Sequence, residues 1–435
     1  MASDRVLLIS GDSHVGPALR RDLRPYCDDR YLEDFDAYAD EMDELKAKVL
    51  ADPSHIDGEL LKRRERGDLI KIAARLAAPD FSDTAKKNYA NVAAVDGLAD
   101  PAARVADMDA EGVAADVIFA GGQNGELLPF VGMGLSVGPA DLKPELQVES
   151  GRIFNRWLAD FVNTNPGRHI GAMQVPIYDL DTAIQEMRVW RERGLKAVNF
   201  PAPRGSFPAY NDPVYEPFWS ACEELDLPLL SHSAGGEEPL GSGGPGGIGV
   251  QFYELFWLGR RAMWQMILGG VFERHPRLKL VLTEQGTRWI PDTLTELDSL
   301  FHCQLGMVDR SLMPRPPSEY FAANCYVVAS FPAPYEIALR HDVGLGNILW
   351  GGDYPHYEGT WPRTMETLRF AFEGVPFEES ARILGGNALG VYDLDARQMA
   401  DLARRIGPTV DELLRPLEQL PEHRGLAFRT TGMYA

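Results

Sequence analysis

Cysteine and positive charge are scarce in this chain of 435 residues. No two of its four cysteines, Cys27, Cys222, Cys303 and Cys325, are close in sequence, whereas zinc knuckles and redox motifs need closely spaced pairs. The 43 lysine and arginine residues face 64 aspartate and glutamate residues, which gives a formal net charge of −21. Nucleic acids and anionic membranes repel such a chain. We therefore expect reduced thiols in a cytoplasmic protein that binds neither nucleic acid nor membrane.

Long apolar runs are missing too. No stretch approaches the ~18 apolar residues that cross a bilayer. The first apolar run, Val6–Ile9, is far shorter than the core of a secretory leader. We therefore expect neither a membrane segment nor a signal peptide.

Short apolar runs recur instead, each followed by a loop and then by a stretch with helical period, as in Asp181–Arg193. Such runs between helices are typical of a buried parallel sheet. They predict an α/β fold, a (β/α)8 TIM barrel. A doubly wound open sheet is the weaker alternative, because no G-x-G-x-x-G follows a strand. The eight predicted strands lie at Val6–Ser10, Ala115–Phe119, Ile170–Val175, Ala197–Phe200, Leu227–Ser231, Leu278–Leu282, Cys325–Ala329 and Asn347–Trp350.

One interval, between the first two strands, is too long for this repeat. We assign residues 1–395 to the barrel, with a helical insertion over about residues 17–105, and residues 396–435 to a helical tail packing on the barrel. Charged helical patterns at Tyr38–Leu50 and Gly58–Leu76 fall in the insertion. Because it follows the C-terminal end of a strand, we expect it on the catalytic face. It is either a lid over the pocket, or a solvated decoration or subunit contact.

Side chains that can bind metal follow four of the strands, and in these barrels the active site lies at that end. They are Asp12 and His14 after the first strand, His232 after the fifth, Glu284 after the sixth, and Asp353 and His356 after the eighth.

Asp12 and His14 are two residues apart, so on a strand they point the same way. Taken alone, Gly-Asp-Ser-His also suits an ordinary polar turn. The whole set favours a metal, since close carboxylates without a cation hold protons or destabilise the fold. Mixed nitrogen and oxygen ligands suit zinc, iron or manganese.

Longer motifs around these residues carry a resemblance: DSH, TEQGTRWIP, GGDYPHYEGTWP and ILGGNALGVYDLD. With them the chain resembles the amidohydrolase-related family. Within it, the resemblance is to the amidohydrolase 2 branch of metal-dependent TIM-barrel enzymes, which includes the aminocarboxymuconate-semialdehyde decarboxylase-like enzymes. It covers roughly residues 5–395.

The resemblance implies that Asp12, His14, His232 and Asp353 bind a metal. In the hydrolases of the family, the residue corresponding to Asp353 takes a proton from a metal-activated water. Two positions depart from the commoner pattern. Asp12 stands where the first histidine of a His-x-His motif is usual, and an acid there is a known variation. Glu284 stands where the family's decarboxylases have a catalytic histidine.

We therefore expect first a metal-dependent hydrolase acting on a small organic molecule, with Asp353 as base and Glu284 as ligand or second acid. The alternative is a dinuclear non-heme iron or manganese monooxygenase on the same barrel, because six candidate ligands, three of them anionic, exceed what one tetrahedral zinc needs. Non-oxidative decarboxylation, a lyase reaction, is third. One or two divalent ions are thus expected. In the simpler reading, Glu284 orients a ligand histidine and His356 binds substrate.

Other residues are weaker candidates. Arg204 follows the fourth strand and suits a substrate carboxylate, although a surface position explains this arginine equally well. Trp289 and Tyr357 suit an apolar pocket, although ordinary packing explains these aromatic residues equally well. His169 and His275 precede strands, so we expect structural roles for both. Family analogy alone implies a homodimer.

Overall fold

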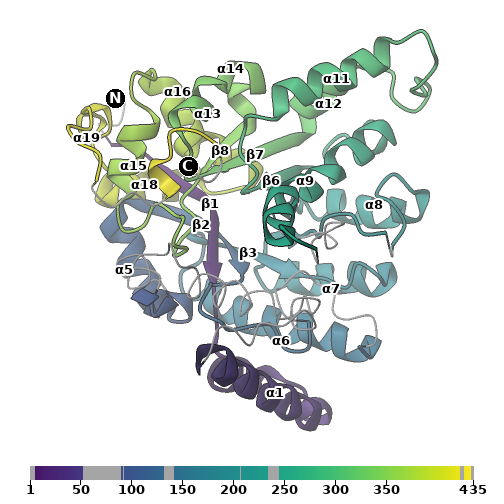
Figure 1. Ribbon diagram of the computed structural model, residues 1–435, viewed down its shortest axis with the longest axis vertical. Coiled ribbons are helices and arrows are strands. Elements are labelled where there is room, and N and C mark those ends of the chain that lie inside the picture. Colours follow the sequence, from purple (N-terminus) through teal and green to yellow (C-terminus); the bar gives the residue numbers. More distant parts are fainter. Residues whose placement is uncertain are drawn as a thin grey trace.

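Eight parallel strands follow one another in sequence order, from β1 to β8. Helices surround them on the outside (Figure 1). The predicted (β/α)8 barrel is confirmed. The computed structural model describes residues 5–51, 90–91, 93–131, 142–205, 207–233, 244–421 and 426–432. The strands are β1 (Leu8–Val15), β2 (Val113–Ala120), β3 (His169–Gln174), β4 (Ala197–Asn199), β5 (Leu229–His232), β6 (Leu280–Thr283), β7 (Cys325–Ser330) and β8 (Ile348–Gly351).

The barrel closes where β1 meets the segment after β8. The Asp353 backbone N–H donates to the Asp12 carbonyl at 2.9 Å, and the His14 N–H donates to the Tyr354 carbonyl at 2.6 Å. Gly351 permits this approach, because a Cβ there would lie 2.9 Å from the Cβ of Asp12. Closure therefore brings the end of β1 beside the end of β8.

Strand β1 is longer than the predicted apolar run, and it contains Asp12 and His14. The polar-turn reading of Gly-Asp-Ser-His was wrong. The register shifts between Ser10 and Ser13, and side chains replace the interrupted ladder: the Ser13 hydroxyl donates to the Val117 carbonyl at 2.6 Å. Ser10 and Ser13 continue the strand because their hydroxyls donate to backbone carbonyls inside the barrel.

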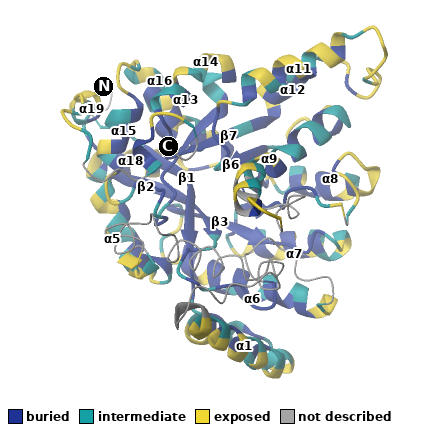
Figure 2. Cartoon of the chain, in the orientation of Figure 1, coloured by how far each residue is buried: buried dark blue, intermediate teal, exposed yellow. Residues whose placement is uncertain are grey.

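The helices form the outer layer, with exposed residues on their outward faces and buried ones towards the strands (Figure 2). Helix α5 shows the local causes: the Asp100 side chain caps it, Pro101 opens it, and Gly112 at φ 75° ends it. The longer helices are α1 (Leu32–Ala51), α5 (Pro101–Glu111), α6 (Pro144–Asn163), α7 (Leu180–Glu192), α8 (Glu216–Glu224), α9 (Gly247–Leu268), α11 (Ile290–His302), α12 (Pro317–Asn324), α15 (Thr364–Ala371) and α18 (Ala396–Ile406).

Shorter helices complete the layer. They are α10 (Val271–Arg274), α13 (Pro334–Ala338), α14 (Arg340–Val343), α16 (Phe377–Ala381), α17 (Asn387–Val391) and α19 (Val410–Leu414). No helix among the described residues is both long and apolar enough for a bilayer crossing.

Helix α1 represents the insertion and lies at the lower edge of Figure 1, below α6. It includes the helix predicted at Tyr38–Leu50, whereas the one predicted at Gly58–Leu76 lies outside the described residues. Lys46 pairs with Glu126 at 2.8 Å, which ties α1 to the segment after β2.

The C-terminal residues contact the barrel at both ends. Near the start of β1, the Val6 N–H donates to the Pro408 carbonyl at 2.8 Å. Farther along, the buried guanidinium of Arg429 pairs with Glu336.

A buried ion pair joins α5 to the strands. The Arg104 guanidinium is fully buried and donates to Asp116 at 2.8 Å, to the Ser13 hydroxyl at 2.6 Å and to the His14 carbonyl at 2.8 Å. His169 approaches the other Asp116 oxygen at 2.8 Å, a structural contact of the kind expected for it. Despite burial, which raises it, the pKa of Asp116 is held well below its usual range by Arg104 and His169.

We expect Asp116→Asn to lower the free energy of unfolding by about 3–5 kcal/mol at pH 7, because it leaves the buried Arg104 uncompensated. Asp116 stabilises the fold above the unfolded aspartate pKa of about 3.9. The difference in the free energy of unfolding between wild type and Asp116→Asn should therefore narrow as the pH falls below that value. Urea unfolding at several pH values measures it.

Glu224→Gln is the matched control, because its partner Arg188 is 47% exposed and Glu224 is 60% exposed. We expect little change there. An Asp116→Asn variant as stable as wild type would mean that this pair does not anchor α5.

Candidate metal centre

Three strands of the barrel bring four of the predicted ligands together. The Asp12 Oδ1 atom lies 3.4 Å from His14 Nε2 and 3.5 Å from His232 Nε2, and His14 Nε2 lies 3.3 Å from Asp353 Oδ1. Asp12 and Asp353 are fully buried. The side chains of β1, β5 and the β8 end therefore meet at one point.

None of these four atoms has a hydrogen-bond partner among the described residues. Buried polar atoms are almost always paired, and an unpaired one is costly. Four unpaired atoms that converge at hydrogen-bond-like distances fit a divalent cation, which would satisfy all of them at once. The donor set of two imidazoles and two carboxylates suits zinc, manganese or iron.

Backbone carbonyls orient the two histidines of this group. His14 Nδ1 lies 3.1 Å from the Ala120 carbonyl, and His232 Nδ1 lies 2.8 Å from the Ser233 carbonyl. A carbonyl can only accept, so each Nδ1 carries a hydrogen and each Nε2 is the nitrogen that faces the centre, where a bound cation would take the place of its proton. On Asp12, Oδ2 accepts from the Ser330 hydroxyl at 2.6 Å, which leaves Oδ1 facing the two histidines.

His356 lies in the same cluster. Its Nε2 is 2.7 Å from the Gly121 carbonyl and its Nδ1 is 2.9 Å from Asp353 Oδ1. The ring stacks on His14 with centroids 3.9 Å apart. His14, Asp353 and His356 thus form a second group whose ligand atoms lie within 4.8 Å of one another.

A third group is wholly acidic and contains a residue that the sequence analysis missed. Ligand atoms of Glu284, Asp353 and Glu358 lie within 4.8 Å of one another. The Ser233 hydroxyl donates to Glu284, and the Gln123 amide donates to Glu358 at 2.8 Å. Glu358 lies in GGDYPHYEG, but only the fold of the loop brings it back to Asp353.

The pKa values describe a pocket rich in negative charge. Burial lowers the pKa of His14, but Asp12 and Asp353 outweigh it and raise that pKa to about 10. Burial raises the pKa of Asp12, yet His14 and His232 hold it well below its usual range. Burial, and then the charge of Asp353, raise the pKa of Glu284 to about 7. The pocket therefore favours positive charge.

The backbone is strained at the same place. Gln123, Glu284 and Asp353 have φ values of 52°, 56° and 55°, in the left-handed region that non-glycine residues seldom occupy. Such strain persists only where the surroundings enforce it, and it gathers at functional sites. All three residues belong to or contact the acidic group.

The weaker candidates follow β4, β6 and β8, and their role in substrate binding stays a prediction. Trp289 is held at the β6–α11 connection: its indole N–H donates to the Gln285 and Gly286 carbonyls at 3.0 Å, and Arg260 lies over the ring at 4.6 Å. Arg204, after β4, and Tyr357, between His356 and Glu358, are both half-buried.

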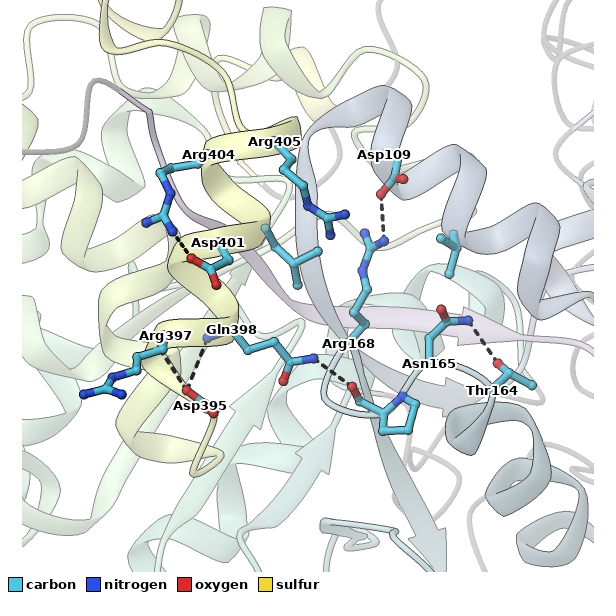
Figure 3. A pocket seen from close by; sticks show the side chains of 13 residues that line it. Asp109, Thr164, Asn165, Arg168, Asp395, Arg397, Gln398, Asp401, Arg404 and Arg405 are labelled. Atoms are coloured by element: carbon cyan, nitrogen blue, oxygen red, sulfur yellow. Dashed lines mark hydrogen bonds and ion pairs between the residues drawn. The ribbon is translucent and has the colours of Figure 1, made fainter.

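A separate pocket of about 1100 Å³ lies at the opposite end of the barrel, between α18, α5 and the start of β3 (Figure 3). The figure shows Arg168 pointing to Asp109, and they pair at 2.7 Å. Arg168 also donates to the Ala114 and Val113 carbonyls at 3.0 and 2.9 Å. These contacts brace the bottom of the barrel, so we place no chemistry there.

Comparison with known proteins agrees with this geometry. The model of the amidohydrolase family matches residues 135–394, more than half of the chain. The chain belongs to the amidohydrolase family. The predicted resemblance is thereby confirmed, and the protein is a metal-dependent enzyme of the amidohydrolase superfamily.

Two curated relatives are decarboxylases. Gamma-resorcylate decarboxylase of Rhodococcus jostii is 26% identical over 273 residues, which cover 58% of this chain and 78% of the relative. The 2-amino-3-carboxymuconate-6-semialdehyde decarboxylase of Dictyostelium discoideum is 26% identical over 266 residues, 58% of this chain and 69% of the relative.

Solved structures share the fold. The 5-carboxyvanillate decarboxylase of Novosphingobium aromaticivorans, solved with manganese and a nitrobenzoic acid, has a TM-score of 0.62 at 18% identity and covers 91% of this chain and 98% of its own. An amidohydrolase of Mycobacterium avium subsp. paratuberculosis has a TM-score of 0.62 at 21% identity, covering 89% and 99%.

We expect Mn²⁺ at about a hundred times its dissociation constant to raise the melting temperature of the chelator-treated protein by on the order of 3 °C, because binding to the folded state alone stabilises it. His14→Ala should reduce this rise, because it removes one ligand of the four-residue centre. Differential scanning calorimetry with and without Mn²⁺ measures it.

His275→Ala is the control, because His275 is also buried beside a carboxylate, 2.9 Å from Glu216, but precedes β6. It should lower stability while keeping the Mn²⁺-dependent rise. A full rise in His14→Ala would remove His14 from the metal centre.

Proposed function

We propose that this protein is a metal-dependent decarboxylase acting on a small phenolic or unsaturated carboxylic acid. The convergence of four unpaired buried ligand atoms from Asp12, His14, His232 and Asp353 carries the proposal. The decarboxylase activity named for the curated relatives supports the choice of reaction. This places non-oxidative decarboxylation ahead of hydrolysis, which the sequence alone had favoured.

In the reaction, the bond between the carboxyl carbon and the neighbouring carbon breaks, CO₂ leaves, and a proton takes its place on that carbon. A divalent cation held by the four residues would supply positive charge and Lewis acidity towards the substrate's oxygens. Asp353 is the residue placed to carry the proton, because it is fully buried and His356 Nδ1 lies 2.9 Å from its Oδ1.

His356 and the strand ends position Asp353. The Gly121 carbonyl accepts from His356 Nε2 at 2.7 Å, which directs Nδ1 to Asp353 Oδ1 at 2.9 Å. The burial of Asp12 and Asp353 excludes water, so the charges at the site act in a low dielectric.

Hydrolysis by metal-activated water is the second candidate, and Glu284 favours it. The resemblance implies a catalytic histidine at this position in decarboxylases, whereas this chain has a carboxylate grouped with Asp353 and Glu358. In that reaction Asp353 would accept the proton of the attacking water.

The test is incubation of the Mn²⁺-loaded protein in D₂O with a panel of phenolic and unsaturated carboxylic acids. Decarboxylation releases CO₂ and places one deuterium on the carbon that lost it, which NMR detects. Cleavage of an amide or ester panel without CO₂ would overturn the proposal in favour of hydrolysis. Oxygen consumption coupled to hydroxylated product would overturn it in favour of the dinuclear oxygenase.

We expect Asp353→Asn to lower kcat about 10²–10⁴-fold, because the amide keeps the shape but cannot carry the proton. Circular dichroism should show an unchanged fold. His275→Ala should keep kcat while losing stability.

Activity retained in Asp353→Asn would reject the assignment of the proton. A folded but inactive His275→Ala would mean that the two ends of the barrel have been reversed.

A further inference from the structure

We propose a second divalent-cation site, formed by Glu284, Glu358 and Asp353, with Asp353 shared between the two ions. This inference does not depend on which reaction the protein catalyses. It extends the four-residue centre to include Glu358, which no sequence motif had singled out.

Charge balance is the first argument. Four carboxylates gather at the barrel mouth: Asp12 and Asp353 are fully buried, Glu358 is 9% exposed, and the Glu284 side chain is 12% exposed. Together they carry −4, so one divalent cation leaves −2 and two leave zero. Among the described residues, Asp12, Glu284 and Asp353 have only histidines as cationic neighbours. Uncompensated buried charge is costly.

Asp353 supplies an independent observation. Its Oδ1 faces His14 at 3.3 Å and His356 at 2.9 Å. Its Oδ2 is buried and has no hydrogen-bond partner among the described residues. Asp353 belongs both to the group with the histidines and to the group with Glu284 and Glu358. Because Asp353 belongs to both groups of ligand atoms, its carboxylate is placed to bind one cation through each oxygen.

The glutamates are oriented as metal ligands are. The Ser233 hydroxyl donates to Glu284 Oε2, and the Gln123 amide donates to Glu358 Oε1 at 2.8 Å. Such hydrogen bonds fix ligating carboxylates. Glu284 and Asp353 both have left-handed backbones, and their ligand atoms lie within 4.8 Å of each other. Glu284, Asp353 and Glu358 all offer carboxylate oxygen, so the site suits a hard cation such as Mn²⁺, Fe²⁺ or Mg²⁺.

The experiment counts ions rather than turnover. Chelator-treated protein is titrated with Mn²⁺ alone in a calorimeter, and bound manganese is measured by elemental analysis. Electron paramagnetic resonance then asks whether the ions are coupled. Wild type should bind about two Mn²⁺ per chain with a spin-coupled spectrum. Glu358→Gln, which keeps size and removes charge, should bind about one, with an uncoupled spectrum.

Glu284→Gln is the second variant and should give the same loss, which keeps the test decisive if one variant fails to fold. Glu149→Gln is the matched control, because Glu149 is a buried glutamate paired with Arg156 at 2.8 Å, and it should still bind two ions. One ion in wild type, or two coupled ions in Glu358→Gln, would overturn the proposal. A failed search for decarboxylation would leave the ion count unchanged, so the two proposals fail separately.

Discussion

Negative charge concentrated at the barrel mouth is the constraint on which the rest of the site depends. Closure between β1 and the segment after β8 joins the backbones of Asp12 and Asp353 by a 2.9 Å hydrogen bond, so their carboxylates are held in one buried space. Without a cation, this arrangement opposes folding. Backbone carbonyls turn His14 and His232 so that their Nε2 atoms face the same point. A metal ion bound there would satisfy the unpaired atoms of both histidines and of the two carboxylates.

The buried Asp116 network shows how the same barrel accommodates a charge that lies outside the candidate metal centre. Asp116 is as buried as the acids of the mouth, yet Arg104, Ser13 and His169 contact both of its oxygens. Both carboxylate oxygens of Asp116 thus have partners, and the network braces α5 against the strands. At the mouth, Asp12 Oδ1 and both Asp353 oxygens have no hydrogen-bond partner among the described residues, and the backbones of Glu284 and Asp353 are strained. Buried groups left in this state mark a functional site.

Family membership explains the fold of this protein, whereas the acidic group at the barrel mouth bears on how many cations it binds. Membership in the amidohydrolase family rests on residues 135–394 and accounts for the barrel fold. The acidic group of Glu284, Asp353 and Glu358 comes from the segments that follow β6 and β8. On our proposal it holds a second cation, which would allow a carboxylic acid to approach a mouth that contains four carboxylates.

The sequence by itself determined the eight strands, because strands buried on both faces are continuous apolar runs between helices. It also placed Asp12, His14, His232 and Asp353, since the ends of parallel strands in a barrel meet at one face. It did not determine that β1 runs on to Val15, which depends on side-chain hydrogen bonds to β2. Nor did it place Glu358 beside Asp353, because the path of a loop depends on long-range packing that local periodicity does not encode. Which buried charges find partners was likewise decided only by the tertiary structure, since partners such as Arg429 and Glu336 lie far apart in the chain.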